Sequence, residues 1–291
     1  MKIAIIGAGI FGITTAIILG KTNDVELFEK NDDILKSASG SNQYRVHRGY
    51  HYPRSPETVR GIVESENSFR ELFSKAIVTN NEHFYCISKN NSLTSSQQFV
   101  DFCKKYNLEI EKASLDCVNK NSIDLCVRVK ESIYDPKILR EISRDLMEKN
   151  KIKIHLNTKA TESILDEFDK IIVCTYANLN ELLTKFPNSQ NEYQFELCEK
   201  PVVKLPDSFK NKSIVIMDGP FMCIDPLANT GLHLLCNVEN EVHQTNIGIY
   251  PKIDEKYLPL LDCGIVKNPS ITNYEKFIES SIPFFPEIKF A

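Results

Sequence analysis

The stretch Lys2-Ile-Ala-Ile-Ile-Gly-Ala-Gly-Ile-Phe-Gly12 decides the fold predicted for this chain of 291 residues. Its apolar run Ile3–Ile6 ends at a glycine, which is typical of a short strand buried on both faces. Gly7, Gly9 and Gly12 then follow with the spacing G-x-G-x-x-G. In this spacing the first glycine permits a tight turn, the second lets the backbone approach a pyrophosphate, and the third lets a helix pack against the strand.

The residues around this motif favour a dinucleotide-binding site. A helix predicted over Ile10–Leu19 would direct its N-terminus, which favours negative charge, at the phosphates. A second strand, Val25–Phe28, ends in Glu29, where an acidic side chain can accept hydrogen bonds from a ribose. The same acid would repel a 2′-phosphate, so NADP is disfavoured. A βαβ unit without a ligand is the alternative, because glycines also serve ordinary turns.

Two other interpretations of the N-terminal segment are disfavoured. Residues 3–20 carry no charge over 18 positions, which is the lower limit for a membrane-spanning helix. Four glycines and two threonines interrupt this run, and no stop-transfer charges frame it. A secretory signal would need a small-x-small cleavage site, which we do not find. We therefore expect a cytoplasmic protein without a membrane span.

The composition is that of a globular protein with one large or two modest domains. Apolar residues make up 42% and charged residues 25% of the chain, and the net charge of −4 comes from interspersed charges of both signs. This distribution offers no basic face for nucleic acid. The nine cysteines form no C-x-x-C pair, which predicts neither a metal site nor a disulfide framework. We expect a small-molecule ligand and no metal.

Residues 42–55 form the densest group of reactive side chains, Asn42-Gln-Tyr-Arg-Val-His-Arg-Gly-Tyr-His-Tyr-Pro-Arg-Ser55. Such a segment is poor material for a core, because each donor would need a buried partner. Near the carboxyl end of a parallel sheet, it would lie where ligands bind in open α/β folds. The alternative is a solvated, cation-rich loop.

Helical and strand patterns alternate along the rest of the chain. Helices are predicted to begin at Pro56 and to cover Ser92–Asn107, Asp135–Lys149 and Asn273–Ile282. In the first of these, the residues expected to face a core are Val59, Ile62, Val63, Phe69, Leu72 and Phe73. Strands are predicted over Phe84–Ser88, Leu125–Ile133, Ile152–Leu156 and Lys170–Cys174. Short strands between Tyr193 and Pro251, including Thr245–Tyr250, predict an antiparallel sheet.

The predicted fold class is α/β, with a Rossmann-like nucleotide-binding domain and an inserted α+β substrate domain. The helix from Asp135 and the two strands after it should rejoin the parallel sheet begun at Ile3, so that sheet resumes after a long insertion. We expect the nucleotide-binding domain to comprise residues 1–75, 136–190 and 266–291. Residues 76–135 and 191–265 would form the substrate domain, with a mainly antiparallel sheet.

Three segments, Ile5–Ala16, Val25–Lys30 and Asp135–Arg140, together resemble the D-amino-acid-oxidase-like superfamily of FAD-dependent oxidoreductases. The order of elements matches over most of the chain. The segment around His47 is similar to the L-2-hydroxyglutarate dehydrogenase branch, and the longer signature over residues 42–55 looks like a bacterial clade of such proteins. The resemblance implies FAD as the cofactor, which the glycine spacing alone does not distinguish from NAD.

The resemblance also implies roles for individual residues. The Gly7–Gly12 loop would hold the pyrophosphate of FAD, Glu29 its ribose, and His47 would lie at the flavin. Arg54 or Arg48 would clamp a substrate carboxylate. The cofactor-binding set is Gly7, Ala8, Gly9, Ile10, Phe11, Gly12, Glu29, Lys30, Ser39, Asn42, Gln43, Arg45, Thr175 and Ala177. The catalytic set is His47, His51, Tyr52 and Arg54.

The implied activity is oxidation of a small amino acid or 2-hydroxy acid, including a sugar-linked one, by hydride transfer to flavin. A histidine with a pKa near the working pH would take the substrate proton. A flavoprotein without net redox turnover, of the sugar-nucleotide isomerase type, is one alternative, and a truncated, non-catalytic nucleotide-binding module is another. Family members normally continue into a strand and glycine turn that close over the flavin, so the end at Ala291 predicts a truncated C-terminus.

Overall fold

The computed structural model describes residues 1–291, except for the side chain of Leu165. The chain divides into two compact units. Unit 1 comprises residues 1–42, 140–198 and 243–271, and unit 2 comprises residues 43–139, 199–242 and 272–291. Residues 43–75, 136–139 and 272–291, which we expected in the nucleotide-binding domain, lie in unit 2. Residues 191–198 and 243–265, which we expected in the substrate domain, lie in unit 1.

Unit 1 contains the predicted parallel sheet. Its four strands lie in the order β10 (Lys170–Val173), β1 (Lys2–Ile6), β2 (Asp24–Phe28) and β9 (Lys153–His155), and every neighbouring pair is parallel. Because β9 and β10 flank β1 and β2, the sheet does resume after the long insertion, as the sequence predicts. The carboxyl ends of all four strands therefore meet at one edge, where open α/β sheets bind ligands.

The helices of the parallel sheet begin and end as the sequence predicts. Helix α1 covers Ile10–Leu19, and the Gly20 N–H that follows it donates to the Ala16 carbonyl at 2.8 Å. Helix α4 covers Pro136–Lys149, and its first turn donates two backbone N–H groups to Asp135 Oδ1. This carboxylate caps the N-terminus of α4.

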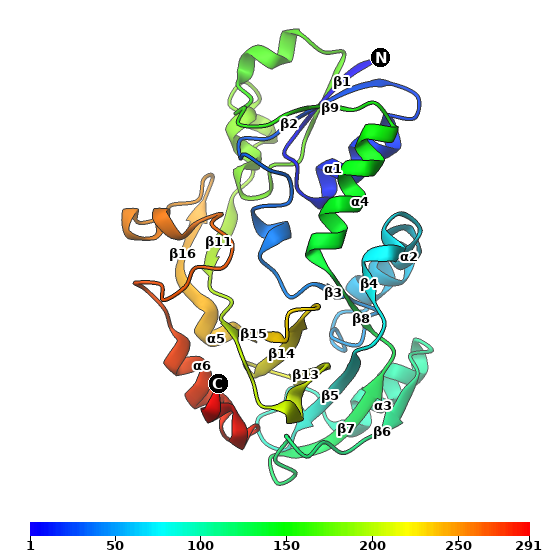
Figure 1. The fold of residues 1–291 in the computed structure, drawn as a ribbon, viewed down its shortest axis with the longest axis vertical. Helices are drawn as coiled ribbons and strands as arrows, with labels where there is room; N and C mark the ends of the chain where they lie inside the picture. Colours follow the sequence, from blue (N-terminus) through cyan, green and yellow to red (C-terminus); the bar gives the residue numbers. More distant parts are fainter. The chain divides into compact units, whose positions relative to one another are not determined.

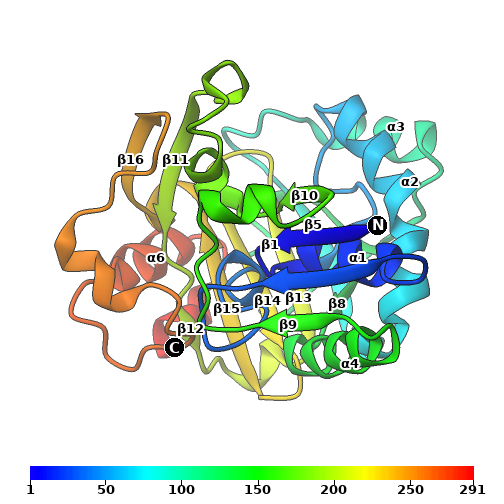
Figure 2. The ribbon, with the colours of Figure 1, turned by 90° about the horizontal axis from the view of Figure 1, so that it is seen from above.

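The segment after β9 packs on one face of the parallel sheet. Its residues Ala160 and Ile164 belong to an apolar cluster with Ala4 and Ile6 of β1. Strands β11 (Tyr193–Cys198) and β16 (Val242–Gly248) form a separate two-stranded ribbon (Figures 1 and 2). The short 3-10 helices of unit 1 are η1 (Ala38–Gly40), η3 (Glu162–Asp166), η4 (Tyr176–Leu182), η5 (Pro187–Ser189) and η7 (Glu255–Leu260).

Unit 2 is built on a seven-stranded, mainly antiparallel sheet, as predicted for the fold class. Only β13 and β5 are paired in parallel. The strand order is β12 (Val202–Val203), β15 (Leu232–Asn237), β14 (Met222–Leu227), β13 (Lys212–Met217), β5 (Glu82–Ser88), β7 (Ile123–Val129) and β6 (Ile110–Lys112).

The two faces of this sheet carry separate cores. One face packs against helix α6 (Tyr274–Ser281), which lies beside β14 and β15 (Figure 1). Phe277 of α6, Ile288 of the 3-10 helix η8 (Pro286–Phe290) and Phe285 between them belong to this core. The other face packs against helix α3 (Ser96–Lys105) and carries Tyr85 among its apolar residues. The remaining elements of unit 2 are β3 (Arg45–Val46), β8 (Ser132–Tyr134) and β4 (Ile77–Val78), which form a three-stranded sheet, and α2 (Pro56–Phe73), α5 (Val238–Glu241), η2 (Ser74–Ala76) and η6 (Asp207–Phe209).

Several element predictions need correction. The strand predicted over Leu125–Ile133 is two strands, β7 and β8, which belong to different sheets and are separated by Lys130 and Glu131. The helix predicted from Ser92 begins at Ser96, because Ser95 forms a capping box with Gln98. The strand predicted over Thr245–Tyr250 is β16, which pairs with β11 rather than with β13–β15.

Helix α2 buries fewer of its apolar residues than the sequence predicts. Of the predicted core positions only Val59 and Phe73 are buried, and Val63 is 49% exposed.

Within the described part of the chain, no helix is both long enough and apolar enough to cross a membrane.

Candidate functional site

The glycine motif forms a corner that closes only because these positions lack side chains. Gly7 has φ +100°, a conformation that other residues rarely adopt. A Cβ atom at Gly7 would lie 2.6 Å from the Cys174 carbonyl oxygen, and one at Gly12 would lie 1.9 Å from the Gly7 carbonyl oxygen. Strand β1, helix α1 and the end of β10 therefore approach one another as closely as the backbone allows.

The N-terminus of α1 at this corner is built like an anion site. The first N–H groups of a helix have no partner within it, and they attract negative charge. Ser39 Oγ accepts one of them, the Ile10 N–H, at 3.0 Å. The cap residue Gly9 makes no side-chain cap, and the first turn contains no acidic residue. The amides of Phe11 and Gly12 are thus left for an external anion.

Glu29 lies beside the same corner, where the sequence predicts it. Its side chain is directed at the glycine loop, since Oε2 accepts the Ala8 N–H at 2.8 Å and Oε1 accepts the Asn31 N–H at 2.9 Å. A carboxylate offers about four lone-pair positions, so two remain for hydroxyl donors. The Ala8 amide, in contrast, is already used by Glu29 and is not available to a phosphate, which corrects its expected role.

The end of β10 completes the corner. Thr175 follows Cys174, and its backbone nitrogen would lie 3.4 Å from a Cβ at Gly7. The Thr175 Oγ1 atom is buried and has no hydrogen-bond partner in the protein. A buried hydroxyl without a partner is costly and marks a place where a ligand or water is missing.

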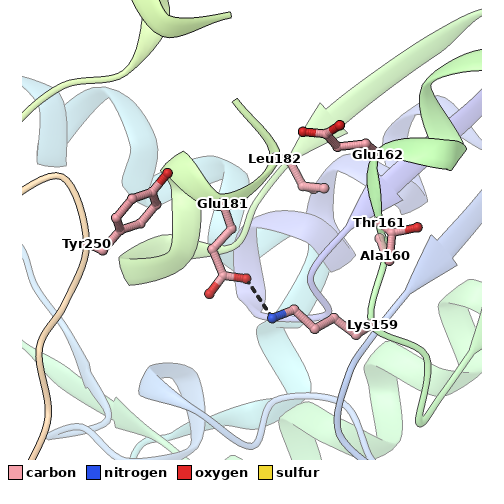
Figure 3. Close-up of a pocket in the computed structure, with 7 residues that line it drawn as sticks. All are labelled: Lys159, Ala160, Thr161, Glu162, Glu181, Leu182 and Tyr250. Atoms are coloured by element: carbon pink, nitrogen blue, oxygen red, sulfur yellow. Dashed lines mark ion pairs between the residues drawn. The ribbon is translucent and has the colours of Figure 1, made fainter. Parts of the chain in front are cut away.

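A cavity of about 390 Å³ lies in unit 1 (Figure 3). Lys159, Thr161 and Glu162, from the segment after β9, line one part of it, and Glu181, from η4 after β10, lines another. Lys159 Nζ and Glu181 Oε2 form an ion pair at 2.9 Å. The cavity is thus formed by the segments that follow β9 and β10, together with Tyr250.

The glycine corner, the Glu29 carboxylate and the unpaired Thr175 hydroxyl together fit a dinucleotide. The other residues expected to bind it stay predictions. Lys30 is paired at 3.9 Å with Asp262, Asn42 donates to the carbonyls of η1 through its side chain, and Ala177 lies on η4. Gln43 and Arg45 lie in unit 2.

Unit 2 has its own polar centre around Arg45, whose side chain is 1% exposed. Its Nη1 donates to Asp225 Oδ1 at 3.0 Å and to Ser213 Oγ at 3.1 Å. Its Nη2 donates to Glu131 Oε2 and, at 3.0 Å, to the Tyr85 hydroxyl oxygen. This guanidinium is already surrounded by two carboxylates, and its expected place among the cofactor-binding residues stays a prediction.

The electrostatics of this centre are dominated by burial and by Arg45. Burial alone would raise the pKa of the Glu131 carboxyl, but the charge of Arg45, the His47 imidazole and the Arg48 amide hold that pKa well below its ordinary value. Burial raises the pKa of the Tyr85 hydroxyl well above its ordinary value. Glu131 is therefore ionised and Tyr85 is a neutral donor.

His47, His51 and Tyr52 lie together beside this centre. The ring centroids of the two histidines are 5.6 Å apart, and that of Tyr52 is 5.7 Å from His47 and 5.3 Å from His51. Burial, with the charges of Arg45 and His47, lowers the pKa of His51 to about 4. His51 is therefore a weak base at neutral pH, and its expected role as proton acceptor is not supported. His47 Nδ1 lies 3.6 Å from Glu131 Oε1.

A second cavity, of about 200 Å³, lies within unit 2. It is lined by Arg45, Val46 and His47 on one side and by Ile62, Ser65, Glu66, Phe69 and Tyr134 on the other. His47 keeps 23% of its side chain exposed. This imidazole can therefore meet a small molecule that enters the cavity.

The two arginines expected to clamp a substrate carboxylate are already paired within unit 2. Arg54 binds Asp218 with two donors, Nε at 2.6 Å and Nη2 at 3.2 Å. Arg48 Nε donates to Glu66 Oε2 at 3.1 Å. A bidentate fork is thus not free at Arg54, which corrects the prediction for this residue.

Sequence reasoning missed most of the Arg45 centre, namely Tyr85, Glu131, Ser213, Asp225 and the buried His83. One signal was present, because Asp225 is a lone acid within the apolar strand β14, and a buried acid requires a partner. Glu131 carries no comparable signal. Among the described residues, no group of three or more His, Cys, Asp or Glu side chains could hold a metal ion.

Comparison with known proteins yields one family model, described as FAD dependent oxidoreductase, which matches residues 2–190 and thus more than half of the chain. The FAD-dependent monooxygenase kojA of Aspergillus flavus is 32% identical over 109 residues. That match covers 35% of this chain and 26% of kojA. The aligned part is thus about a quarter of the length of that relative.

Solved structures share the fold at low sequence identity. A glycine oxidase from Geobacillus kaustophilus has a TM-score of 0.71 at 12% identity, covering 99% of this chain and 79% of the oxidase. The dithionite-reduced L-alpha-glycerophosphate oxidase of Mycoplasma pneumoniae, with FAD bound, has a TM-score of 0.66 at 16% identity, covering 98% and 79% of the two chains.

Proposed function

Because the chain belongs to the family of FAD-dependent oxidoreductases, we propose that it binds FAD and oxidises a small amino acid or 2-hydroxy acid. FAD is the cofactor of this family. The observation that carries the proposal is the glycine corner of unit 1, where Gly7 and Gly12 leave no room for a side chain and Glu29 faces the loop.

In this proposal unit 1 binds the cofactor through backbone N–H groups, carboxylate lone pairs and a hydroxyl that make no other hydrogen bond. The amides of Phe11 and Gly12 would hold the pyrophosphate, as the N-terminus of a helix does for other phosphates. The two remaining lone-pair positions of Glu29 would accept the ribose hydroxyls. The 390 Å³ cavity is large enough for the adenine ring, and Thr175 Oγ1 would find its missing partner on the cofactor.

In unit 2, His47 would take the proton that leaves the substrate oxygen or nitrogen. When bound, FAD supplies the chemistry of the oxidation, since it accepts a hydride from the substrate carbon. The His47 imidazole is suited to the proton, because it lines the 200 Å³ cavity and has an ionised carboxylate beside it.

The size of that cavity supports a small substrate, since pockets for drug-sized ligands are commonly 300–1,000 Å³. A 2-hydroxy acid is favoured by the likeness of the segment around His47 to the L-2-hydroxyglutarate dehydrogenase branch. An amino acid is favoured by the wider superfamily. The same proton acceptor serves both, since a proton leaves either the hydroxyl or the amine.

The test is the visible spectrum of the purified protein, before and after incubation with FAD. We expect a yellow flavin spectrum that is bleached under anaerobic conditions by one member of a panel of D- and L-amino acids and 2-hydroxy acids. A colourless protein that cannot be loaded with FAD would contradict cofactor binding. A loaded protein that no member of the panel bleaches would contradict the proposed substrate class.

A monooxygenase is a second candidate, and the observation that favours it is the 32% identity to a protein named as an FAD-dependent monooxygenase. The two activities differ in the fate of dioxygen. A monooxygenase transfers one oxygen atom to its product, so mass spectrometry after turnover under ¹⁸O₂ would show the label in the product. An oxidase or dehydrogenase would leave the organic product unlabelled by ¹⁸O₂.

A further inference from the structure

We propose that Glu131 is a positioning residue that holds the Nδ1 side of the His47 imidazole, so that Nε2 is the proton acceptor. This inference rests on the proposed function, in which His47 takes the substrate proton. It adds a residue that lies in the turn between β7 and β8, 84 positions after His47 in the sequence. Four observations, all within unit 2, support it.

The first observation is that one nitrogen of His47 is buried without a partner. The Nδ1 atom has no hydrogen bond in the protein, and Glu131 Oε1 lies 3.6 Å from it. Buried polar groups are almost always hydrogen-bonded. Catalytic hydrogen bonds are often long in the absence of substrate and shorten in the complex. A small rotation of the imidazole would bring Nδ1 within hydrogen-bond distance of Glu131.

The second observation is that Glu131 is fixed and has one acceptor position left. Its Oε2 accepts from Arg45 Nη2 and, at 3.0 Å, from the Tyr85 hydroxyl. Its Oε1 accepts the Arg48 N–H at 3.0 Å. A carboxylate has about four acceptor positions, so three donors leave one on Oε1, the oxygen nearest His47.

The third observation is an excess of negative charge. Arg45 is paired with both Asp225 and Glu131, and the side chains of all three are at most 1% exposed. One guanidinium balances one carboxylate, so the three groups leave one net negative charge in the interior. An uncompensated buried charge is expensive. Proton uptake by His47 supplies the missing positive charge, so Glu131 stabilises the imidazolium that forms during the reaction.

The fourth observation is that the other groups around His47 do not compete for this role. His51 and Tyr52 contact its ring from the same loop, and Tyr134 of β8 and Glu66 of α2 line the same cavity. Arg45 and Arg48 are the neighbouring cations. Glu66 is bound by Arg48 and Arg70, which compensate its charge. Glu131 is therefore the carboxylate whose charge is left for His47.

An ionised carboxylate can only accept hydrogen bonds, so the nitrogen that faces it must carry the hydrogen. This fixes the neutral imidazole in the Nδ1–H tautomer and leaves a lone pair on Nε2. Since Nδ1 is buried while the ring remains 23% exposed, the exposed edge of the ring is one that does not carry Nδ1. His47 and Glu131 thus form a base and the carboxylate that orients it, the arrangement by which other enzymes activate a nucleophile.

The test is the ¹⁵N NMR spectrum of the imidazole rings in the wild-type protein. The chain has six histidines, and the spectrum of a His47→Gln variant assigns the signals of His47. We expect neutral His47 to show a protonated Nδ1 and an unprotonated Nε2. The Nε2–H tautomer in the wild type would overturn the proposal, whatever any variant does. This readout requires neither substrate nor turnover.

Glu131→Gln, with Glu109→Gln as its matched control, provides the kinetic test. Glu109 is exposed and pairs with Lys130, the neighbour of Glu131, so its loss removes an adjacent charge without touching His47. In Glu131→Gln we expect the Nε2–H tautomer to rise and flavin reduction to slow about a hundredfold, with an unchanged KM. Glu109→Gln should change neither. An unchanged tautomer, or an unchanged rate, in a folded Glu131→Gln protein would refute the positioning role.

His47→Ala separates failure of this inference from failure of the proposed function. If His47→Ala reduces its flavin as fast as the wild type, the proposed base is wrong, and with it the role of Glu131. If His47→Ala is slow while Glu131→Gln is fast, the base stands and only the positioning role fails.

Discussion

The glycine corner of unit 1 and the Arg45 centre of unit 2 are built from contacts of very different sequence separation. At the corner, Glu29 receives the Ala8 N–H from 21 positions away and Ser39 receives the Ile10 N–H from 29 positions away, so that only the end of β10, at Cys174 and Thr175, comes from a distant part of the sequence. In the Arg45 centre the partners Glu131, Ser213 and Asp225 lie 86, 168 and 180 positions away. A dinucleotide corner can therefore be recognised in a short sequence window, whereas a buried ion cluster cannot.

The two regions also differ in what holds them together. Backbone groups and the absence of side chains shape the glycine corner, so its chemistry depends on geometry. Ionised side chains removed from water shape the Arg45 centre, and each of them depends on its partners. Substitutions should thus act by steric clash in the first region and by uncompensated charge in the second.

The largest effect is expected for Arg45→Met. This change leaves Glu131 and Asp225 buried without a cation, and breaking a buried pair by removing one partner typically costs about 3–5 kcal/mol. The free energy of unfolding, measured by urea denaturation, should fall accordingly. The control is Arg128→Met, which breaks pairs with Glu82 and Glu111 in which both partners are exposed and should leave the free energy of unfolding nearly unchanged. Equal losses in the two variants would contradict the contrast between buried and exposed charge.

Gly12→Ala should have the next largest effect. A Cβ at this position would lie 1.9 Å from the Gly7 carbonyl oxygen, which belongs to the backbone and cannot rotate away. We expect a loss of stability near the upper end of overpacking costs, about 3 kcal/mol, together with loss of FAD binding.

The matched control for Gly12→Ala is Gly61→Ala, because Gly61 also lies in a helix but has no atom within 4 Å of its would-be Cβ. Alanine is the better helix former, so this variant should be more stable by about 0.5–1 kcal/mol. Wild-type flavin content in Gly12→Ala would show that the corner tolerates a side chain.

Glu29→Gln tests whether the Glu29 side chain contributes to FAD binding at the corner. The amide keeps the shape of the side chain but loses the charge and one acceptor oxygen. A hydrogen bond to a charged group contributes about 1.5–3 kcal/mol, so the Kd for FAD should rise by at least roughly tenfold. Flavin fluorescence titration of the apoprotein measures this Kd. An unchanged Kd would remove Glu29 from the cofactor site.

The effect that is smallest at neutral pH is a pH dependence that arises from His83, which is 1% exposed on β5. Burial, with the charge of Arg45, lowers its pKa to about 3 from the ordinary value of 6.5. The unfolded chain therefore binds the proton first, so this contribution is complete above pH 6.5 and is lost as the pH falls below it. His83→Phe should reduce the slope of unfolding free energy against pH between 6.5 and 4 by up to about 1.4 kcal/mol per pH unit. Identical slopes would contradict a neutral buried His83.

The parts of the fold that follow from local patterns were predictable. The strand of residues 2–6, helix α1 and the capped helix α4 each depend on a short run of apolar residues, a glycine turn or an N-cap. The break between β7 and β8 was not predictable, because Glu131 leaves the strand pattern to meet Arg45, which is distant in sequence. The pairing of β16 with β11 was not predictable either, because the alternation of apolar and polar residues identifies a strand but not the strand it pairs with.

The candidate site divides in the same way. Gly7, Gly12 and Glu29 were identified from spacing and Ser39 from the family resemblance, and the structure brings the four to one corner. Arg45 was identified as a reactive cation, but the carboxylates that surround it were not, since the sequence does not show contacts between distant residues. His51 was expected to accept the substrate proton, but its burial lowers its pKa. The sequence does not show this burial, because it depends on packing between distant segments.

The parallel pairing of β5 with β13 has a consequence for folding during synthesis. Strand β5 is translated together with β6 and β7, but β13 begins at Lys212, after the ribosome has passed residues 130–211. At about 5–20 residues per second, several seconds elapse before β13 emerges. Throughout that delay the edge of β5 presents unpaired peptide groups beside apolar side chains, which is a template for aggregation. This edge is covered only when residues 212–217 arrive and pair with β5.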